Sequence, residues 1–470
     1  MVYSINPNYQ HMNYNIVTSP KATKINNSVS CSSDKPSFTS NTVSPFAFQA
    51  ASNPAKLRTE LVTKEEKDMY NEIVKLSDKN TKKALNTLLK NGKLLNNDSN
   101  DKSNVLDNLY KIITTPRAEG LNSIVIMRDI INTIANPFVI TQQFGDIPEQ
   151  YASAATSAHY ASKVSGTPSF GATVPDEINV TNSGTCVAAS VQFNLADKQP
   201  AEYARFAEGL SSPNVSVSKN IKFSNLADST LDAVWLLNAF EIPYEANDFE
   251  NIKLKFAPDK NALLRAQIQT THKDPLERSA VDVLMQSTFM QVGSQQSYDS
   301  LTDKRAGKFN QNDKGLIEFE KTFTESVVED KNKISVTYQT VDENAKLIGY
   351  ETDFDTIKNQ ITESLKMGEN VIIGYTQVDN TNTIINGHEI TIIGTKPSAN
   401  GKLIFICNDT DDGLSKSIEY TEDYLLPKIH HAALPKKVLE NDMMLVENWV
   451  EGLKTYKELK KQASENLQAA

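Results

Sequence analysis

Apolar residues recur at helical spacing in the early part of the chain. Residues 1–55 are rich in Ser, Asn, Thr and Pro and show no apolar period, which is typical of a disordered leader. The sequence Thr63-Lys64-Glu65-Glu66 then resembles a helix-capping box, and apolar positions repeat every three or four residues after it. Four such stripes predict a helical module over residues 56–137, at 69–76, 84–89, 105–113 and 124–134.

Helical and strand patterns alternate in the remainder of the chain. Composition and spacing predict further helices at 150–165, 186–196, 200–210, 230–240, 274–292 and 354–367. Alternating or continuous apolar runs predict strands at 252–256, 334–338, 371–375, 388–394 and 402–407. A charged stretch with an apolar stripe over 438–467 predicts a C-terminal helix within residues 433–470. Together these patterns favour an α+β fold.

Length, charge and cysteine content narrow the class of protein. A chain of 470 residues is long enough for two or three domains. Its formal net charge of -10 argues against nucleic acid and anionic membrane surfaces as partners. Three cysteines predict no disulfide framework, and the six histidines show no metal-site spacing, so no cofactor is expected. No signal peptide and no long apolar run is visible, which predicts a soluble protein, either cytoplasmic or exported by a nonclassical route.

One cysteine, Cys186, lies in a stretch whose sequence favours a reactive thiol. Asn182-Ser183-Gly184-Thr185-Cys186 joins small, flexible residues to an Ala-rich segment that begins a predicted helix. At the first turn of a helix, the peptide dipoles point their positive ends toward the sulfur and make it a better nucleophile. A cysteine that serves only as a small buried apolar residue has the same sequence pattern. A catalytic role for Cys186 therefore depends on a base elsewhere in the chain.

A candidate partner for the cysteine comes much later in the chain. His388 follows Gly387 and opens a predicted apolar strand, and the next predicted strand ends at Asn408-Asp409. A thiol nucleophile needs a base to take its proton, and the base needs a third group to hold its ring. If the two strands pair as a hairpin, Asn408 or Asp409 lies beside His388. Cys186, His388 and one of these two residues are therefore the candidate catalytic groups.

This order of residues resembles the papain-like cysteine peptidase superfamily. The resemblance rests on Cys186 before a helix, Gly-His before a strand, Asn408 after the next strand, and a helix, Gly turn and buried strand over 354–375. It covers residues 174–426 and implies a papain-like fold, with a helical half and an antiparallel sheet half, over residues 138–432. It further implies that 56–137 is either an inhibitory propeptide or a docking bundle, and that 274–331 is an insertion, either shaping substrate access or forming a peripheral helix pair.

The resemblance also sets expectations for the reaction. The family's oxyanion-binding Gln has no counterpart between Phe170 and Cys186, so Asn182 or Asn179 is the amide expected to replace it. Hydrolysis of peptide bonds in a protein or peptide substrate, through a thioacyl-enzyme, is the implied activity. The same groups would serve a transglutaminase-like acyltransferase or a deamidase, and the absent Gln leaves a non-catalytic binding protein open. The oligomeric state does not follow from the sequence.

Two other clusters contain residue types that bind metals. The run from Asp409 to Gly413 has acidic residues at alternate positions but lacks the distant Glu of a calcium loop, so an acidic turn is expected. His430-His431 is expected at the end of a short helix over 420–431, where cations suit the helix dipole, and not as a pair of ligands.

Overall fold

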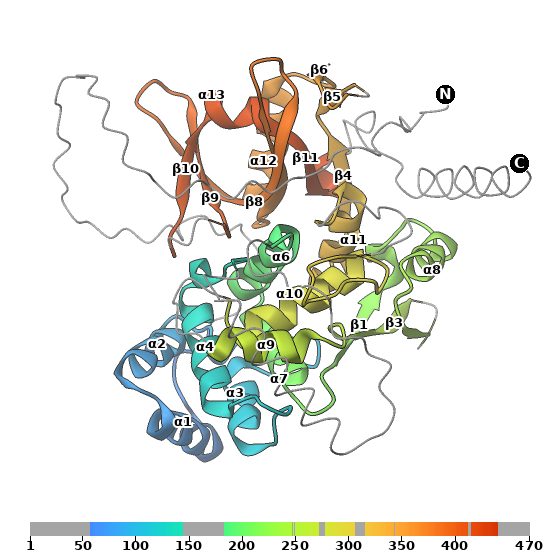
Figure 1. The fold of residues 1–470 in the computed structure, drawn as a ribbon. Helices are drawn as coiled ribbons and strands as arrows, with labels where there is room; N and C mark the ends of the chain where they lie inside the picture. The colour runs from blue at the N-terminus through green and yellow to red at the C-terminus, as the bar shows by residue number, and fades with distance from the viewer. Residues whose placement is uncertain are drawn as a thin grey trace, which may run out of the picture.

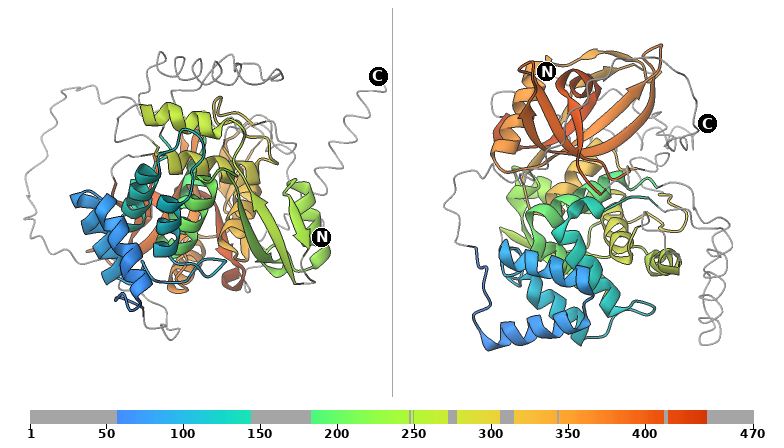
Figure 2. Two further views of the ribbon diagram at one scale, coloured as in Figure 1. Left: turned by 90° about the horizontal axis from the view of Figure 1, so that it is seen from below. Right: turned by 90° about the vertical axis from the view of Figure 1, so that its left-hand side faces the viewer.

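The chain folds into a helical half and a sheet half that pack against each other (Figures 1 and 2). The computed structural model describes residues 57–143, 183–246, 248, 250–271, 278–305, 315–342, 344–411 and 415–439. The mixture of helices with antiparallel sheet confirms the α+β class. Predictions for the leader 1–55, the helix at 150–165, the amides Asn179 and Asn182, and the C-terminal segment from 440 onward lie outside the described residues.

The four helices predicted within residues 56–137 are present, and they belong to a larger core. They are α1 (Lys64–Leu76), α2 (Lys79–Lys90), α3 (Val105–Thr114) and α4 (Ser123–Ala135), followed by the short η2 (Pro137–Val139). The capping box predicted at Thr63 forms, with Glu66 closing it. Buried residues of all four helices share one hydrophobic cluster with the later helices of this half. The module is therefore continuous with the rest of the helical half.

The later helices complete this half. They are α6 (Cys186–Lys198), α7 (Pro200–Leu210), α8 (Thr230–Ala239), α9 (Ala262–Thr271) and α10 (Ala280–Gly293). A small antiparallel sheet of order β1-β3-β2 flanks them, with β1 at Val217–Lys222, β2 at Tyr244–Ala246 and β3 at Asn251–Phe256. Every residue of α10 is buried, and so are most residues of α11 (Glu318–Glu329). The helices α10 and α11 are therefore central and not a peripheral pair, because their apolar residues belong to the core of the helical half.

The sheet half is built on six antiparallel strands in the order β10-β9-β8-β7-β11-β4. The strands are β4 (Lys333–Thr337), β7 (Val371–Val378), β8 (Ile384–Pro397), β9 (Leu403–Asn408), β10 (Ile418–Thr421) and β11 (Ile429–Pro435). A two-stranded sheet of β5 (Gln339–Val341) and β6 (Leu347–Tyr350) stands beside them, and α12 (Phe354–Lys366) follows β6.

Both faces of the central strand β7 are covered. Ile372 belongs to the apolar cluster of the helical half, whereas Val371 and Ile373 belong to a second cluster that includes Ile357 and Ile361 of α12. Successive side chains of a strand point to opposite faces. The sheet is therefore packed between α12 on one side and the helices α6 and α11 on the other.

The C-terminal part of the described chain differs from the sequence-based predictions. His388 lies inside the long strand β8 and does not open it. Residues 418–435 form β10, α13 (Glu422–Leu425), η4 (Leu426–Lys428) and β11, so His430 and His431 lie in a strand and not at a helix end. The predicted C-terminal helical segment also loses residues 433–435 to β11. The reason is that a short apolar run suits a buried strand and a buried helix equally well until its neighbours are known.

One further expectation concerns membrane-spanning helices. Among the described residues, no helix combines the length and the apolar character needed to cross a bilayer.

The aromatic contact between α7, β3 and α10 predicts a large effect on stability. Phe206 is fully buried, and its ring centroid lies 5.4 Å from that of Phe256 and 5.8 Å from that of Phe289. We expect Phe206→Ala to lower the free energy of unfolding by about 3–5 kcal/mol, measured by urea denaturation, because it leaves a cavity between three elements. Leu231→Ala is the control, since Leu231 is 82% exposed and its loss should change stability by less than about 0.5 kcal/mol. Equal effects of the two changes would contradict this account of the core.

Candidate functional site

Cys186 is the first residue of α6, and a buried polar network holds the segment that leads to it. The hydroxyl of Thr185 donates to Gln286 Oε1 at 2.8 Å, and Ser183 Oγ lies 2.7 Å from Thr185 Oγ1. The backbone N–H of Gly184 donates to Asp303 at 2.7 Å. These groups are buried, so their mutual hydrogen bonds are costly to break. The start of α6 is therefore fixed in place.

The rest of α6 is almost completely enclosed. Eleven of its thirteen residues are buried, from Cys186 to Ala196, and the helix packs against α10, α11 and β8. Small side chains such as Ala188 and Ala189 allow this close approach on several sides. The Cys186 side chain keeps only a little exposure, at 8% for the residue. The thiol thus stands, nearly buried, at the start of a helix whose packing on several sides holds it in place.

The pairing of β8 with β9 brings the histidine and the aspartate together. Thr391 pairs with Asn408, so the next residue, Asp409, comes opposite Ile390 and diagonal to His388. Diagonal neighbours on one face of an antiparallel pair are within reach of long side chains. His388 Nε2 lies 2.8 Å from Asp409 Oδ1. The hairpin expected from the sequence forms, and Asp409 is the residue that contacts the imidazole.

The Cys186 side chain also lies close enough to the His388 imidazole to raise the pKa of the ring. Because Nε2 is engaged by Asp409, the other ring nitrogen, Nδ1, is left for the sulfur. Burial lowers the pKa of His388, but the Asp409 carboxylate and the Cys186 side chain more than offset this, and the pKa stands well above its ordinary value. Burial raises the pKa of Asp409, but its contact with His388 more than offsets this and leaves the Asp409 pKa below the usual range. The pair therefore favours an imidazolium beside a carboxylate.

Asn408 occupies a different environment from Asp409. Its side chain is buried, and its Nδ2 atom has no hydrogen-bond partner within the described part of the chain. As the last residue of β9 it points to the opposite side of the strand from Asp409. Of the two residues predicted as the third member of the site, only Asp409 contacts His388.

Two glutamines that sequence reasoning did not single out hold the turn after Asp409. The backbone N–H of Gln142 donates to the Thr410 carbonyl at 3.0 Å, and the Thr410 hydroxyl donates to Gln142 Oε1 at 2.9 Å. The side chain of Gln143 donates to the carboxylate and the backbone carbonyl of Asp411. Gln142 and Gln143 follow a short apolar segment with no period of its own, so no sequence signal linked them to residues 410–411. They fix the acidic turn in which Asp409 lies.

A cluster of tyrosines lies next to the histidine and was also not predicted. Tyr375 is the direct cross-strand partner of His388, and its hydroxyl lies 2.7 Å from that of Tyr424. The rings of Tyr420 and Tyr424 stack with centroids 5.4 Å apart. Burial raises the pKa of Tyr375 and Tyr420, so both hydroxyls stay protonated at neutral pH. These rings give the site an aromatic wall beside the imidazole.

No protein-family model, no curated protein and no solved structure matches this chain. The geometry of Cys186, His388 and Asp409 is therefore the basis for any functional conclusion.

The opposite pKa shifts of His388 and Asp409 predict a pH window for their interaction. A raised His pKa stabilises the fold fully below the ordinary value of about 6.5, and this is lost as pH rises through the folded value. A lowered Asp pKa stabilises it above the ordinary value of about 3.9, and this is lost as pH falls through the folded value. We expect the coupling free energy from a double-mutant cycle of His388→Gln and Asp409→Ala to be largest between about pH 4 and 6.5.

The measurement is urea denaturation of the four proteins across pH. The matched control is the exposed pair of Lys396 and Glu419, whose coupling should stay below about 1 kcal/mol throughout. A coupling between His388 and Asp409 that does not vary with pH would mean that the two side chains do not interact as ions.

Proposed function

We propose that this protein is a cysteine peptidase with a papain-like arrangement of its catalytic groups. The observation that carries the proposal is the position of the His388 imidazole, which lies 2.8 Å from the Asp409 carboxylate and close enough to the Cys186 side chain for that side chain to raise the pKa of the ring. A nucleophile, a base and a group that orients the base are the three parts that acyl transfer by a thiol requires.

The arrangement of the two halves supports the papain-like interpretation. The thiol stands at the start of an enclosed helix in the helical half, and the imidazole and carboxylate come from adjacent antiparallel strands of the sheet half. The three groups meet where the halves pack together, in the chain order Cys, His, Asp. The proposal requires an extended peptide to reach these groups along the boundary between the halves, where the side chains of His388 and Asp409 keep 16% and 15% of their surface exposed.

The proposed reaction follows from these positions. The Cys186 sulfur attacks the carbonyl carbon of a peptide bond, and the proton of the thiol is held by His388. The tetrahedral intermediate then expels the amine, which takes that proton from the imidazolium and leaves a thioester on Cys186. A water molecule, deprotonated by His388, hydrolyses the thioester and restores the thiol. Asp409 keeps the ring oriented and offsets its positive charge in each half of the cycle.

Oxyanion stabilisation is assigned to groups at the start of α6. The first backbone N–H groups of a helix have no intrahelical acceptor, so the N–H of Cys186 is suited to bind the developing negative charge. Asn182 is proposed as the side-chain donor, in place of the glutamine that the superfamily uses.

Two other activities are compatible with the same groups. An acyltransferase would pass the acyl group to an amine in place of water, and a deamidase would act on a side-chain amide. A binding protein without activity would leave Cys186 no more reactive than a free thiol. The helical module, whose buried residues are part of the common core, is better suited to a permanent structural role than to removal as a propeptide.

The reactivity of Cys186 tests whether its thiolate forms an ion pair with the imidazolium of His388. We expect iodoacetamide to label Cys186 at about pH 5.5 roughly 10²-fold faster than an unpaired thiol, because imidazolium stabilises the thiolate. His388→Ala should abolish this advantage, and Asp409→Ala should reduce it. Peptide mapping of the labelled protein gives the rate at each cysteine.

Two residues serve as matched controls for the labelling. Cys407 is fully buried, and burial raises the pKa of its thiol, so it should stay unlabelled in the folded protein. Asn408→Ala should leave the labelling rate of Cys186 within about two-fold, because Asn408 does not contact His388. Wild-type labelling no faster than that of a free thiol would sink the catalytic proposal.

The products of the reaction separate hydrolysis from transfer. We expect the full chain to cleave members of a peptide library with water as the acceptor, with Cys186→Ala lowering kcat by at least about 10³-fold. Mass spectrometry should show new carboxyl termini. An added primary amine that captures most of the acyl product at low concentration would identify an acyltransferase instead, and ammonia release from intact peptides would identify a deamidase.

A further inference from the structure

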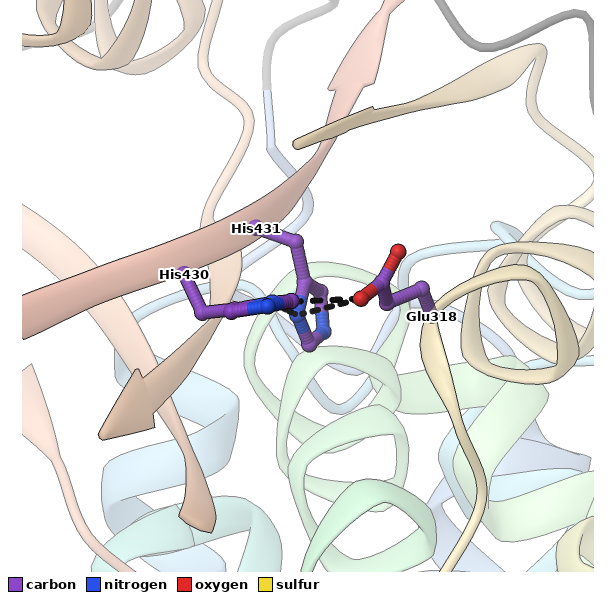
Figure 3. Close-up of side chains that lie close together, drawn as sticks. All are labelled: Glu318, His430 and His431. Carbon is purple, nitrogen blue, oxygen red and sulfur yellow. Dashed lines mark hydrogen bonds and ion pairs between the residues drawn. The ribbon is translucent and has the colours of Figure 1, made fainter. Parts of the chain in front are cut away.

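A second cluster of chemically active side chains lies where α11 meets β11, away from the Cys186 thiol. Figure 3 shows His430 and His431, from consecutive positions of β11, turned toward the carboxylate of Glu318 at the first turn of α11. Both histidines are buried, at 1% and 2% exposure, and Glu318 is mostly buried. Consecutive strand residues ordinarily diverge. Here the register of β11 against β7 shifts between Ile429 and His431, and this irregularity lets the two imidazoles converge on one carboxylate.

The distances among the three groups have the size of a metal coordination shell. His430 Nδ1 lies 3.0 Å from His431 Nδ1 and 3.1 Å from Glu318 Oε1, and His431 Nδ1 lies 3.8 Å from the same oxygen. In a tetrahedral site with zinc–nitrogen bonds of about 2.0–2.1 Å, ligand atoms stand about 3.3 Å apart. The three observed separations bracket that value without any movement of the chain.

The two Nδ1 atoms of His430 and His431 and the Oε1 atom of Glu318 form a triangle. Hydrogen bonds alone account poorly for it. A ring nitrogen offers either one N–H or one lone pair in the plane of the ring, and a carboxylate oxygen is only an acceptor when ionised. His430 Nδ1 faces both His431 Nδ1 and Glu318 Oε1 at hydrogen-bond distance, yet it has a single group to direct at them. A cation at the centre would accept all three lone pairs together.

The groups around the triangle resemble the outer shell of a metal site. His431 Nε2 lies 3.0 Å from Glu389 Oε1, so a carboxylate stands beside the ring nitrogen that would not bind the metal. The Thr337 hydroxyl donates to the second oxygen of Glu318 at 3.1 Å. The nearest cation, Lys321, is directed to the other Glu389 oxygen and to the Ile372 carbonyl, both at 3.3 Å.

The neighbouring strand is shaped to accept the His431 ring. A Cβ on Gly374 of β7 would come within 2.2 Å of His431 Cε1 and 2.4 Å of His431 Nδ1. No side chain larger than glycine fits at this position while the ring points toward Glu318. The Glu318 side chain keeps 14% of its surface exposed, so the cluster is not completely closed off from solvent.

We propose that Glu318, His430 and His431 form a binding site for a divalent transition-metal ion, with Zn²⁺ as the best fit. Two imidazole nitrogens and one carboxylate oxygen are a ligand set that zinc accepts, and a fourth position is left for water. The ion would join the first turn of α11 to β11. The site does not depend on the proposed peptidase activity, since none of its ligands contributes to the catalytic groups.

Metal binding by the full-length chain tests this proposal. Protein treated with EDTA and desalted is titrated with Zn²⁺ against a chromophoric chelator, and separately with Co²⁺ while the visible spectrum is recorded. We expect one equivalent to bind, with intense d–d bands of a four-coordinate site and no thiolate charge-transfer band. We also expect Zn²⁺ to raise the Tm of the wild type. Glu318→Gln and His431→Gln should weaken binding by more than about 100-fold, and Glu389→Gln by about 10-fold.

Matched variants separate this site from the thiol. Cys186→Ser should bind the metal as tightly as the wild type, because Cys186 is not a ligand here. The Co²⁺ spectrum and the Tm shift are read on the wild type, so they decide the question even if a ligand variant does not fold. The proposal is overturned if folded wild type binds no stoichiometric metal, if folded Glu318→Gln binds unchanged, or if Cys186→Ser abolishes binding.

Discussion

The burial of α6 between the two halves of the molecule is the constraint on which the candidate site depends. Nearly all of this helix is enclosed, with α10 and α11 on one side and the sheet on the other. Because the interior is close-packed, a helix in this position cannot slide or rotate without opening cavities. Cys186 is therefore held at one point in space by residues that take no part in chemistry. Hydrogen bonds that Thr185 and Gly184 of the preceding segment donate to Gln286 and Asp303 hold that end of the helix in place.

The sheet provides the other half of the site with the same rigidity. The register of β8 against β9 decides that Asp409 contacts His388, because a shift of one residue would bring Asn408 to that face. Gln142 and Gln143, far away in the sequence, hold the turn that carries Asp409. An ion pair in such a buried place is costly unless its geometry is good. The surrounding hydrogen bonds supply that geometry.

Consecutive residues of β8 serve two separate clusters. His388 faces Asp409 and Cys186, whereas Glu389 faces His431 and Lys321. The alternation of side chains along a strand makes this division possible. Both clusters lie where helices of one half meet strands of the other, so each links the halves by polar contacts as well as by apolar packing. A metal at the second cluster would restrain His431 and, through it, Glu389, the residue of β8 next to His388.

The sequence by itself determined the features that arise from neighbouring residues. The capping box at Thr63, the amphipathic stripes of α1 to α4, the start of α6 at Cys186 and the β8–β9 hairpin follow from local spacing and chemistry. Only the tertiary structure decided the features that depend on distant partners. The choice of Asp409 over Asn408 needed the strand register, and the burial of α10 needed the packing of helices from distant parts of the chain around it. The convergence of His430 and His431 on Glu318 needed a strand where the local pattern suited a helix equally well. Local sequence carries backbone preference and the period of burial, but it carries no information on which residues far along the chain come to face each other.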